Sequence, residues 1–398
     1  MPRLTESSSD SLPEASGQST AAPATVHHTG LEWTGGATRV ARLLASGMAE
    51  TGAGVRLTCE VAEPGPHGEA ASVLSATMVA PCGFGPQLAA GETAHIHCTG
   101  DWPGLLNAIP EGARAVITLH DCELFTGGCP YPLDCPALDR ECADPCPRKF
   151  PHSRRVRQVK RLSLRRLGPT LVAPSRWLAR LAGEHLGLPV AVIPNGIPWP
   201  ARSMSRREAR VRLGILPAAR VAVFAAHGGL GAAYKAGSAW RSLWQGIKAR
   251  VPQALCFAVG GDSESRDGDL VIWPYVERER LALLMAAADV LLYPTLADNH
   301  SLVILEAMAQ GLPVVAHGVG GVPEQVAHDT TGLLVGPGDR AGFVEAAAAL
   351  LADPARCRAL GANAFASGRK RFTVERMIAD YAKVYARLRE PRPSSEEE

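Results

Sequence analysis

One pattern occurs twice in this chain, and it limits the folds that the chain can adopt. Short apolar segments alternate with segments of helical length, first before residue 197 and then after it. This alternation predicts βαβ units with parallel sheets, and the turn sequence Pro194-Asn195-Gly196 separates the two series. We therefore predict an α/β protein of two doubly wound, Rossmann-like domains, with a ligand cleft between them at the carboxyl ends of the strands. The predicted strands are Val26–Thr29, Val55–Cys59, His95–His97, Ala115–Thr118, Thr170–Ala173, Val221–Ala225, Ala254–Val259, Val290–Tyr293 and Val314–Ala316.

The same pattern gives the expected domain boundaries. Residues 1–24 are rich in Ser, Ala, Pro and Thr and have no apolar period, so we expect a disordered tail. The first domain is expected at 25–196, with a cysteine-rich insert at 122–147, and the second at 197–372. A final helix at 373–390 has apolar residues along one face. We expect that helix to pack back toward the first domain.

Composition and charge exclude several classes of protein. The chain has 41 Lys and Arg against 39 Asp and Glu, a formal net charge of +2, whereas nucleic-acid-binding proteins are typically far more basic. No apolar run approaches the roughly 18 residues that cross a bilayer. The polar start of the chain lacks the apolar segment of a signal peptide. These features favour a cytoplasmic enzyme that does not bind nucleic acid.

The segment after the strand at Val290–Tyr293 carries the strongest chemical signal. A polar loop leads to a helix that is expected at Leu302–Gln310, and the free N–H groups at the start of a helix form a ready site for an anion. Asp298 in the loop can cap the helix, and Glu306 lies about one turn inside it. Carboxylates accept hydrogen bonds from sugar and ribose hydroxyls. The segment therefore predicts a ligand that is part diphosphate and part polyol.

An ordered series of motifs follows. It contains Glu306-Ala-Met-Ala-Gln-Gly311-Leu-Pro-Val-Val-Ala316, Gly320-Gly-Val-Pro-Glu324, Thr331-Gly-Leu-Leu-Val335 and Pro337-Gly-Asp339, and earlier Ala173-Pro-Ser-Arg-Trp-Leu-Ala179 and Ile193-Pro-Asn-Gly-Ile197. This series resembles the retaining GT-B glycosyltransferases of the family four type (glycosyl transferases group 1). The resemblance covers residues 30–388. It implies the GT-B fold, in which the first domain faces the acceptor and the second binds a nucleotide sugar.

The resemblance also implies roles for residues of the second domain. Glu306 would bind the nucleotide ribose, and Asp298, which replaces a longer glutamate of the family, would lie near the transferred sugar. Lys235 matches a lysine that binds the donor diphosphate. The arginine that precedes this lysine in the family is absent, and His227 or the backbone N–H groups of nearby glycines could replace it. The other donor-binding residues are expected to be Asn299, His300, Ser301 and Leu302.

In the first domain, Gly35 and Gly36 match the family's loop under the diphosphate, at the start of a helix expected from Ala37 to about Thr51. His120, followed by Asp121, stands directly after a strand and would reach the donor sugar. We therefore expect His120, Asp298 and Lys235 to be the catalytic residues. His97 has a similar position at a strand end and is a weaker candidate.

Together these features imply a retaining glycosyltransferase. It would move a sugar from a nucleotide-diphosphate sugar to a hydroxyl of a saccharide or lipid-linked acceptor, in polysaccharide or glycoconjugate synthesis. No cofactor is expected for catalysis. Two alternatives stay open. The shortened Asp298 and the absent arginine motivate a non-catalytic GT-B scaffold that binds a nucleotide sugar, and the second alternative is another GT-B reaction such as sugar-phosphate synthesis.

Five of the ten cysteines lie close together, beginning at Cys122. The other four, Cys129, Cys135, Cys142 and Cys146, are interspersed with prolines and glycines that leave little room for helices or strands. A small insert without its own core is a natural place for a structural metal. We expect these four thiolates to form a structural zinc site, with free thiols or a disulfide pair as alternatives.

Residues 148–166 hold nine Lys and Arg and no acidic residue. Val156, Val159, Leu162 and Leu167 indicate an amphipathic helix in this basic segment. Such a helix could rest on anionic lipid headgroups, which would place the protein peripherally on the cytoplasmic face of a membrane. The alternative is a solvated face whose apolar stripe packs inward.

Overall fold

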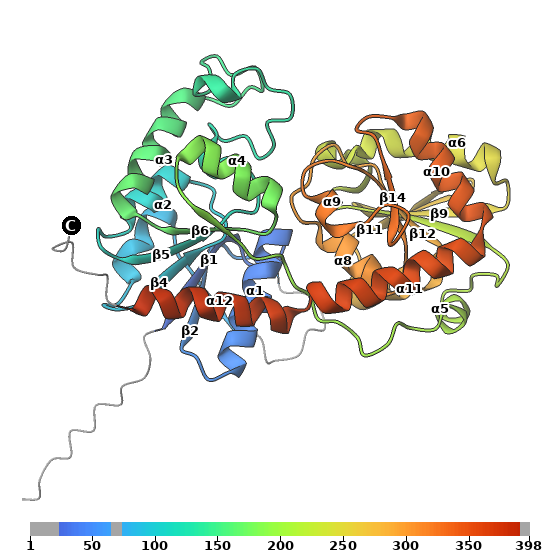
Figure 1. Ribbon diagram of the computed structural model, residues 1–398, viewed down its shortest axis with the longest axis horizontal. Coiled ribbons are helices and arrows are strands. Elements are labelled where there is room, and N and C mark those ends of the chain that lie inside the picture. Colours follow the sequence, from blue (N-terminus) through green and yellow to red (C-terminus); the bar gives the residue numbers. More distant parts are fainter. Residues whose placement is uncertain (1–23, 65–73, 391–398) are drawn as a thin grey trace, which may run out of the picture.

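The computed structural model describes residues 24–64 and 74–390, which form two α/β domains side by side (Figure 1). The tail expected at 1–24 lies, except for its last residue, outside the described residues. The strands of the first domain are β1 (Thr25–Leu31), β2 (Val55–Val61), β3 (Ala76–Met78), β4 (Thr93–Ile96), β5 (Arg114–Thr118), β6 (Thr170–Ala173) and β7 (Val190–Val192). Those of the second are β8 (Arg220–Ala225), β9 (Ala254–Gly261), β10 (Ser265–Asp267), β11 (Leu270–Pro274), β12 (Val290–Tyr293), β13 (Val314–His317) and β14 (Gly332–Val335).

Helices cover both faces of each sheet (Figure 1). The helices that belong to the first domain are α1 (Gly36–Glu50), α2 (Trp102–Ala108), α3 (Ser153–Leu167) and α4 (Arg176–Leu186). The later ones are α5 (Arg206–Arg212), α6 (Trp240–Arg250), α7 (Arg278–Ala287), α8 (Leu302–Ala309), α9 (Val322–Gln325), α10 (Arg340–Ala352), α11 (Pro354–Arg371) and α12 (Val374–Arg389).

The two sheets share one topology. The first has the order β3-β2-β1-β4-β5-β6-β7 with all strands parallel. The second has the order β10-β11-β9-β8-β12-β13-β14, and only β10 runs antiparallel to its neighbour. Without the edge strands β7 and β10, both orders read 3-2-1-4-5-6, the doubly wound order of dinucleotide-binding domains. The prediction of two doubly wound domains is confirmed.

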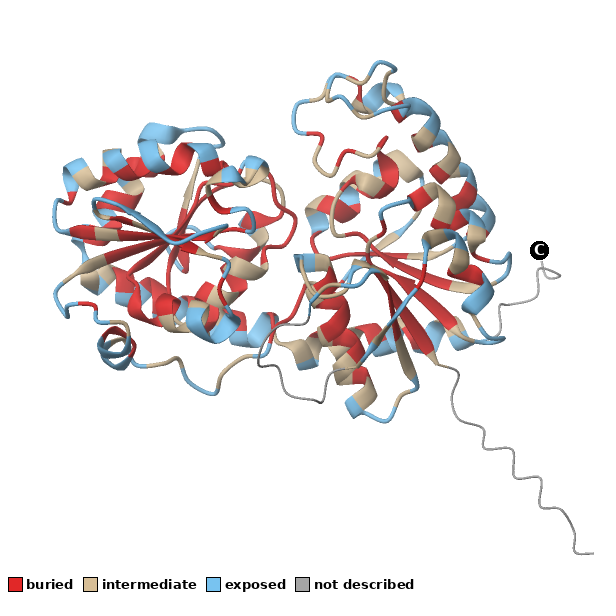
Figure 2. Cartoon of the chain, turned by 180° about the vertical axis from the view of Figure 1, so that it is seen from behind, coloured by how far each residue is buried: buried red, intermediate tan, exposed pale blue. Residues whose placement is uncertain are grey.

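The central strands are buried on both faces, which explains why they read as continuous apolar runs. Along β8, Val221, Val223 and Ala225 enter one core, while Ala222 and Phe224 enter the core on the opposite face. Figure 2 shows the buried strands at the centre of each domain and the exposed outer faces of the helices around them. Packing of the cores on both faces therefore stabilises the sheets, and the loops at the carboxyl ends of the strands are free to form a ligand site.

The chain crosses between the domains twice, and the crossings lie side by side. The Ile197 N–H donates to the carbonyl of Phe372 at 3.0 Å, and the Val374 N–H donates to the carbonyl of Ile197 at 3.0 Å. After the second crossing, α12 runs along the first domain (Figure 1). There Tyr381 and Tyr385 pack in one cluster with residues of α1, β5 and β6. The final helix thus ties the end of the second domain to the first.

The basic segment forms α3, and its inward face matches the apolar stripe only in part, since Leu167 is buried. Arg157 and Lys160 are buried, whereas Leu162 is 65% exposed. The two charged side chains turn inward because they donate hydrogen bonds to the backbone carbonyls of Leu138 and Glu123. Among the described residues, no helix has both the length and the apolar character needed to span a membrane.

Candidate functional site

A cleft of about 620 Å³ lies where the carboxyl ends of the two sheets face each other. Its walls come from residues 30–38 after β1, 98–100 after β4, 226–235 after β8 and 298–303 after β12. In each sheet these are the two central strands where the strand order reverses, the place where doubly wound sheets bind ligands. The topology therefore brings both ligand-binding edges to one cleft.

A narrower pocket of about 150 Å³ adjoins this cleft. Glu306 and Arg39 line it, and Tyr275 after β11 lies on its wall. The pocket and the cleft share the Gly35–Gly36 turn as well as His227, Leu302 and other residues. They form a site with two connected compartments, which we call the bipartite site.

Lys235 and Asp298 lie together in the cleft. The Lys235 ammonium is 2.7 Å from Oδ2 of Asp298. The Asp298 carboxylate also accepts hydrogen bonds from the Tyr293 hydroxyl and from the Asn299 N–H, at 2.8 Å in the second case. Burial alone would raise the pKa of Asp298, but the ammonium and these hydrogen bonds hold it below its usual value. Asp298 is therefore an anion, and the ammonium of Lys235 balances its charge in the cleft.

Glu306 has a partner that the sequence did not reveal. Its carboxylate forms an ion pair with Arg39, which comes from α1 in the first domain. Both side chains are 15% exposed. Arg39 lies three residues after Gly36, and therefore on the same helix face, so the spacing in α1 was a signal for a cleft-facing cation. The ion pair bridges the two domains at the narrow compartment.

The start of α8 offers backbone N–H groups to the cleft. The Ser301 hydroxyl caps the helix by accepting from the Ile304 N–H at 3.4 Å, and the Ser301 N–H donates to the side-chain carbonyl of Gln325 at 2.8 Å. The first turn of a helix has no intrahelical partner for its N–H groups. Leu302 and Val303, in that first turn, line the cleft. This end of α8 is therefore suited to an anionic group.

Asn299 and His300 have partners in the first domain. The Asn299 amide donates to the carbonyls of Leu119 and His120 at 3.2 Å each and accepts from the Ser175 hydroxyl. The Asn195 amide donates to the His300 carbonyl at 3.1 Å. The predicted donor-binding role of the Asn299 side chain thus competes with an interdomain role that the sequence did not suggest.

Two motifs of the sequence meet at the same interface. Glu324 lies in the Gly-Gly-Val-Pro-Glu motif of the second domain. Its carboxylate accepts hydrogen bonds from the N–H groups of Arg176 and Trp177 at 2.9 and 2.8 Å. These groups form the first turn of α4, where a negative charge is favourable. The motif therefore holds the domains together in this arrangement.

The glycines of that motif allow a close backbone contact. A Cβ added to Gly321 would lie 1.8 Å from the carbonyl oxygen of Asn299, and one added to Gly320 would lie 2.0 Å from that of Asp298. Both oxygens belong to the backbone, so they can yield only if the loop moves. Gly320 also has a φ of +57°, which glycine adopts without strain.

We expect Gly321→Ala to displace the Asp298–Asn299 loop. The overlap should cost at least about 2 kcal/mol of unfolding free energy and should weaken ligand binding at the cleft. Urea unfolding of the variant measures the first effect. Gly336→Ala is the matched control, because an added Cβ there makes only an ordinary contact with Asp339, at 3.9 Å. Equal stability of both variants would contradict the close contact.

Gly35 ends the loop that enters α1. Its φ of 96° with ψ of 152° is open in practice to glycine alone. Gly35 and Gly36 together line both compartments of the bipartite site. A ligand can therefore approach this backbone closely, as their predicted place under a diphosphate requires.

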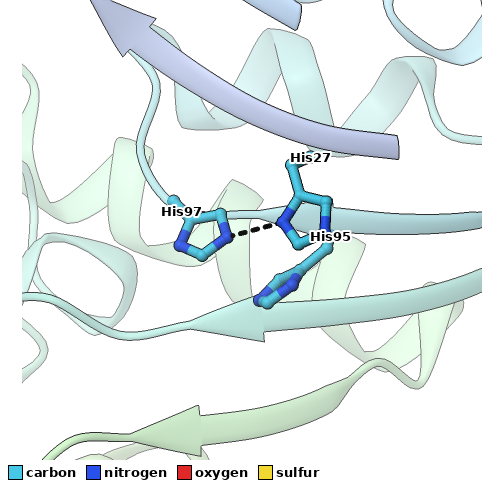
Figure 3. A group of neighbouring side chains, drawn as sticks. All are labelled: His27, His95 and His97. Carbon is cyan, nitrogen blue, oxygen red and sulfur yellow. Dashed lines mark hydrogen bonds between the residues drawn. The ribbon is translucent and has the colours of Figure 1, made fainter. Parts of the chain in front are cut away.

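His120 lies at the end of a row of histidines. Nδ1 of His27 is 3.2 Å from Nε2 of His97, and Nδ1 of His97 is 3.2 Å from Nε2 of His120. Figure 3 shows His27 and His95 on neighbouring strands, with His97 just beyond one strand end. Burial lowers the pKa of His27 to about 3 and that of His120 to about 4. The rings are therefore neutral at neutral pH, with one donor and one acceptor nitrogen each.

The histidine at the buried end of this row determines the direction in which its hydrogen bonds are donated. Nε2 of His27 is buried without a hydrogen-bond partner. Because an unpaired buried acceptor is more common than an unpaired N–H, we assign the proton of His27 to Nδ1, which donates to His97. His97 then donates from Nδ1 to His120, whose own proton is on Nδ1. His120 lines the cleft, and in this tautomer the ring nitrogen that His97 leaves free is a hydrogen-bond donor.

The ring nitrogens of His27, His95 and His97 lie within 4.8 Å of one another, as a metal ion would require. Both nitrogens of His95 are engaged, however. Nδ1 pairs with the Tyr385 hydroxyl at 2.6 Å and Nε2 pairs with the Thr118 hydroxyl at 2.8 Å. The trio is better described as a hydrogen-bonded network that links the sheet to α12.

Two further carboxyl groups line the cleft. Burial and the nearby Glu123 raise the pKa of Asp121 to about 7. Burial also acts to raise the pKa of Glu60, but hydrogen bonds from His28, Thr99 and Gly100 bring it below its usual value. Glu60 was not found from the sequence, because only the pairing of β1 with β2 brings it to the strand ends beside the cleft.

Comparison with known proteins agrees with this geometry. The family model for glycosyl transferases group 1 matches residues 230–353. The N-acetyl-alpha-D-glucosaminyl L-malate synthase of Bacillus anthracis is 35% identical over 109 residues, which are 27% of this chain and 29% of that protein. The D-inositol 3-phosphate glycosyltransferase of Mycobacterium avium is 32% identical over 214 residues, 52% of this chain and 45% of that protein. The chain spans less than half the length of these relatives.

Solved structures extend the likeness to both domains. The sucrose-phosphate synthase from Thermosynechococcus elongatus has a TM-score of 0.71 at 18% identity, over 92% of this chain and 99% of that chain. HepE of Anabaena, in complex with UDP-glucose, has a TM-score of 0.68 at 17% identity, over 92% and 99%. At such identities the likeness shows the fold.

The fold and the cleft define a protein of the GT-B class, with two Rossmann-like domains that face each other. Within the second domain, residues 230–353 match the family model for glycosyl transferases group 1. The resemblance to glycosyl transferases group 1 is confirmed for that segment, and the GT-B fold is confirmed for the two domains.

Proposed function

We propose that the protein is a retaining glycosyltransferase that moves a sugar from a nucleotide-diphosphate sugar to a hydroxyl of a saccharide or lipid-linked acceptor, in polysaccharide or glycoconjugate synthesis. The bipartite site carries this proposal. Glu306 lines its narrow compartment, Lys235, Asp298 and His120 line its wide compartment, and the glycine turn lines both. This shape suits a ligand with a nucleoside at one end, a sugar at the other and a diphosphate between them. The UDP-glucose complex of HepE supports a donor of this class.

In this proposal the nucleoside enters the narrow compartment beside Tyr275. Glu306 accepts hydrogen bonds from the ribose hydroxyls, so Arg39 must release its carboxylate when the donor binds. Arg39, which lines the narrow compartment, would then be released to bind the donor from the first domain. Beside Lys235 it would supply a second cation, in place of the arginine that this chain lacks.

Catalysis would be mostly electrostatic. Negative charge grows on the diphosphate as its bond to the sugar breaks, and groups already oriented toward that charge stabilise it. Lys235 and the first N–H groups of α8 are such groups. His120 and Asp298 would bind the sugar hydroxyls from opposite domains.

The acceptor hydroxyl must lose a proton as the new bond forms. Asp121 lines the same cleft, and its pKa of about 7 suits proton transfer near neutral pH. A carboxyl group with that pKa is partly ionised at pH 7, so it can take the proton of the acceptor.

A transfer assay tests the proposal. The purified chain is incubated with a panel of nucleotide-diphosphate sugars and simple sugar or polyol acceptors, and the product is examined by nuclear magnetic resonance. We expect release of the nucleoside diphosphate that depends on the acceptor, with the anomeric configuration of the donor kept in the product. Donor binding without transfer to any acceptor would favour the non-catalytic scaffold, and inversion would contradict the retaining mechanism.

We also propose peripheral contact with anionic lipid through the outer face of α3. Arg155, Leu162 and Arg165 are exposed on that face. An apolar side chain among cations is typical of helices that rest on lipid headgroups. Sedimentation with vesicles that contain an anionic lipid should show binding that salt weakens, and no binding at low salt would contradict the contact.

A further inference from the structure

The cysteine-rich insert between β5 and α3 has almost no core of its own. Its first residues, among them Leu124 and Phe125, pack into the core of the first domain. Of the twenty residues 131–150, however, only Pro132 and Ala137 are buried. The insert forms the loops at the top of the first domain in Figure 1. Side-chain packing inside the insert therefore cannot account for a fixed conformation.

The backbone of the insert also needs an external source of stability. Non-glycine residues with a positive φ, between 49° and 65°, are concentrated here: Leu133, Glu141, Cys142, Lys149 and His152. Each left-handed residue other than glycine costs roughly 1–2 kcal/mol. Hydrogen bonds from α3, such as those of Arg157 to the Leu138 carbonyl and of Ser153 to the Ala143 carbonyl, hold this segment on one side. A bound metal ion would hold it from within.

The four cysteines surround a single cavity. Cys129, Cys135, Cys142 and Cys146 all line a cavity of about 20 Å³. None of the cysteines of the chain is in a disulfide. The volume is close to that of one water-sized probe. It therefore suits a single ion and is too small for an iron–sulfur cluster.

Positive charges around the cavity would balance the negative charge of four thiolates with one divalent ion. Four thiolates and a divalent cation carry a net charge of about −2. Arg148 lines the same cavity, and a terminal nitrogen of the buried Arg157 lies 3.7 Å from the sulfur of Cys142. Two arginines therefore stand where they would balance that charge.

We propose that Cys129, Cys135, Cys142 and Cys146 bind one zinc ion as a tetrahedral set of four thiolates. Binding replaces the thiol protons by bonds to the metal, so up to four protons leave for solvent. Zinc–sulfur bonds of about 2.3 Å place the sulfurs roughly 3.8 Å apart. Among the described residues, only the histidine trio has three ligand atoms that all lie within 4.8 Å of one another, so the four sulfurs are farther apart than a bound ion requires. The cysteine side chains must therefore rotate inward around the ion.

The zinc-bound insert forms a wall of the bipartite site. Tyr131 lines the cleft, and its ring packs edge-on against Tyr234 at 5.3 Å between centroids. Arg148 donates a hydrogen bond to the Tyr234 hydroxyl at 3.2 Å. Tyr234 directly precedes Lys235. The ion thus positions, across the domain interface, the loop that carries the lysine; this step rests on the proposed function, whereas the zinc site does not.

Metal analysis of the full chain tests the zinc site. After purification under reducing conditions we expect about one zinc per chain. Cobalt bound in its place should show the visible bands of tetrahedral thiolate coordination. Iron in place of zinc, or a zinc content far below one per chain after zinc is supplied, would overturn the proposal.

Single substitutions identify the ligands. Cys135→Ser and Cys142→Ser should each lower zinc affinity at least tenfold, measured by competition with a chelator. The matched control is Cys82→Ser, because Cys82 is an exposed free thiol outside the insert. It should keep both the zinc content and the activity of the wild type. Equal zinc affinity in all three variants would overturn the assignment of these ligands.

Tyr234→Phe tests the coupling to the donor site separately. The variant keeps the ring and removes only the hydroxyl that Arg148 contacts. We expect a normal zinc content with a several-fold rise in the donor KM and little change in kcat. An unchanged KM would contradict the coupling and leave the zinc site standing.

Discussion

Replacing Lys235 by alanine is expected to lower kcat/KM for sugar transfer by a factor of about 10² to 10³. Removal of one oriented donor from a developing anion costs about that much in enzymes that stabilise charge in this way. Lys235 also neutralises Asp298 at 2.7 Å. The variant therefore loses the cation for the diphosphate and leaves a buried carboxylate with one partner fewer.

Steady-state kinetics of three variants separate these effects. Lys248→Ala is the matched control, because Lys248 forms a similar ion pair with Asp269 at 2.7 Å and a similar 27% of its side chain is exposed. It should keep the wild-type rate. In Lys235→Ala/Asp298→Asn the buried charge is removed together with its partner, so stability should recover while activity stays low. Wild-type activity in Lys235→Ala would show that the lysine does not act on the donor.

Acid is expected to destabilise the folded chain strongly between pH 6.5 and pH 5. Burial lowers the pKa of His27 and of His300 to about 3, and that of His120 to about 4. In the unfolded chain a histidine titrates near pH 6.5. Unfolding therefore takes up protons below pH 6.5, and stability, complete above that pH, is lost as the pH falls. At pH 5 each histidine accounts for about 2 kcal/mol, or about 6 kcal/mol for the three.

Other buried groups reduce or increase this acid-induced loss of stability. The raised pKa of Asp121, about 7, works in the opposite sense, because the folded chain takes up that proton first. It returns about 2 kcal/mol on going from pH 7 to pH 5. His95 and His97 also have lowered pKa values through burial, and they add to the loss. A net loss of several kcal/mol is a large part of the stability of a typical domain.

Urea unfolding at pH 7 and pH 5 measures this effect. The midpoint should fall clearly at the lower pH, and proton uptake should accompany unfolding there. His27→Asn removes one of the buried rings, so its stability should depend less on pH by about 2 kcal/mol over this interval. The same midpoint at both pH values would contradict the burial of neutral histidines.

The secondary structure could be predicted because local patterns decide it. A helix expected from Ala37 to about Thr51 is found at Gly36–Glu50, and one expected at Leu302–Gln310 is found at Leu302–Ala309. Parallel strands buried on both faces give apolar runs that stand out from amphipathic helices. In α3 the same reasoning gave only part of the inward face, since Leu167 is buried but Leu162 is exposed. Local periodicity does not show that Arg157 turns inward to a carbonyl of the insert.

The site was only partly visible in the sequence. Lys235, Asp298 and Glu306 lie in motifs close to turns and helix ends, where their chemistry can be inferred from neighbours. Arg39 could not be paired with Glu306 from the sequence, because 267 residues separate them and only the domain arrangement brings them together. His27 was missed for a similar reason, since its contact with His97 follows from the pairing of β1 with β4.

Equilibrium binding tests the central claim, that the bipartite site holds a nucleotide-diphosphate sugar. Calorimetric titration of the wild-type chain with a panel of such sugars should find at least one that binds at one site per chain. Glu306→Ala should weaken that binding at least tenfold. Glu345→Ala should leave it unchanged, because Glu345 pairs with Arg250 on the surface of the same domain, at 3.4 Å. Absence of binding across the panel, or equal affinity in Glu306→Ala, would contradict the account.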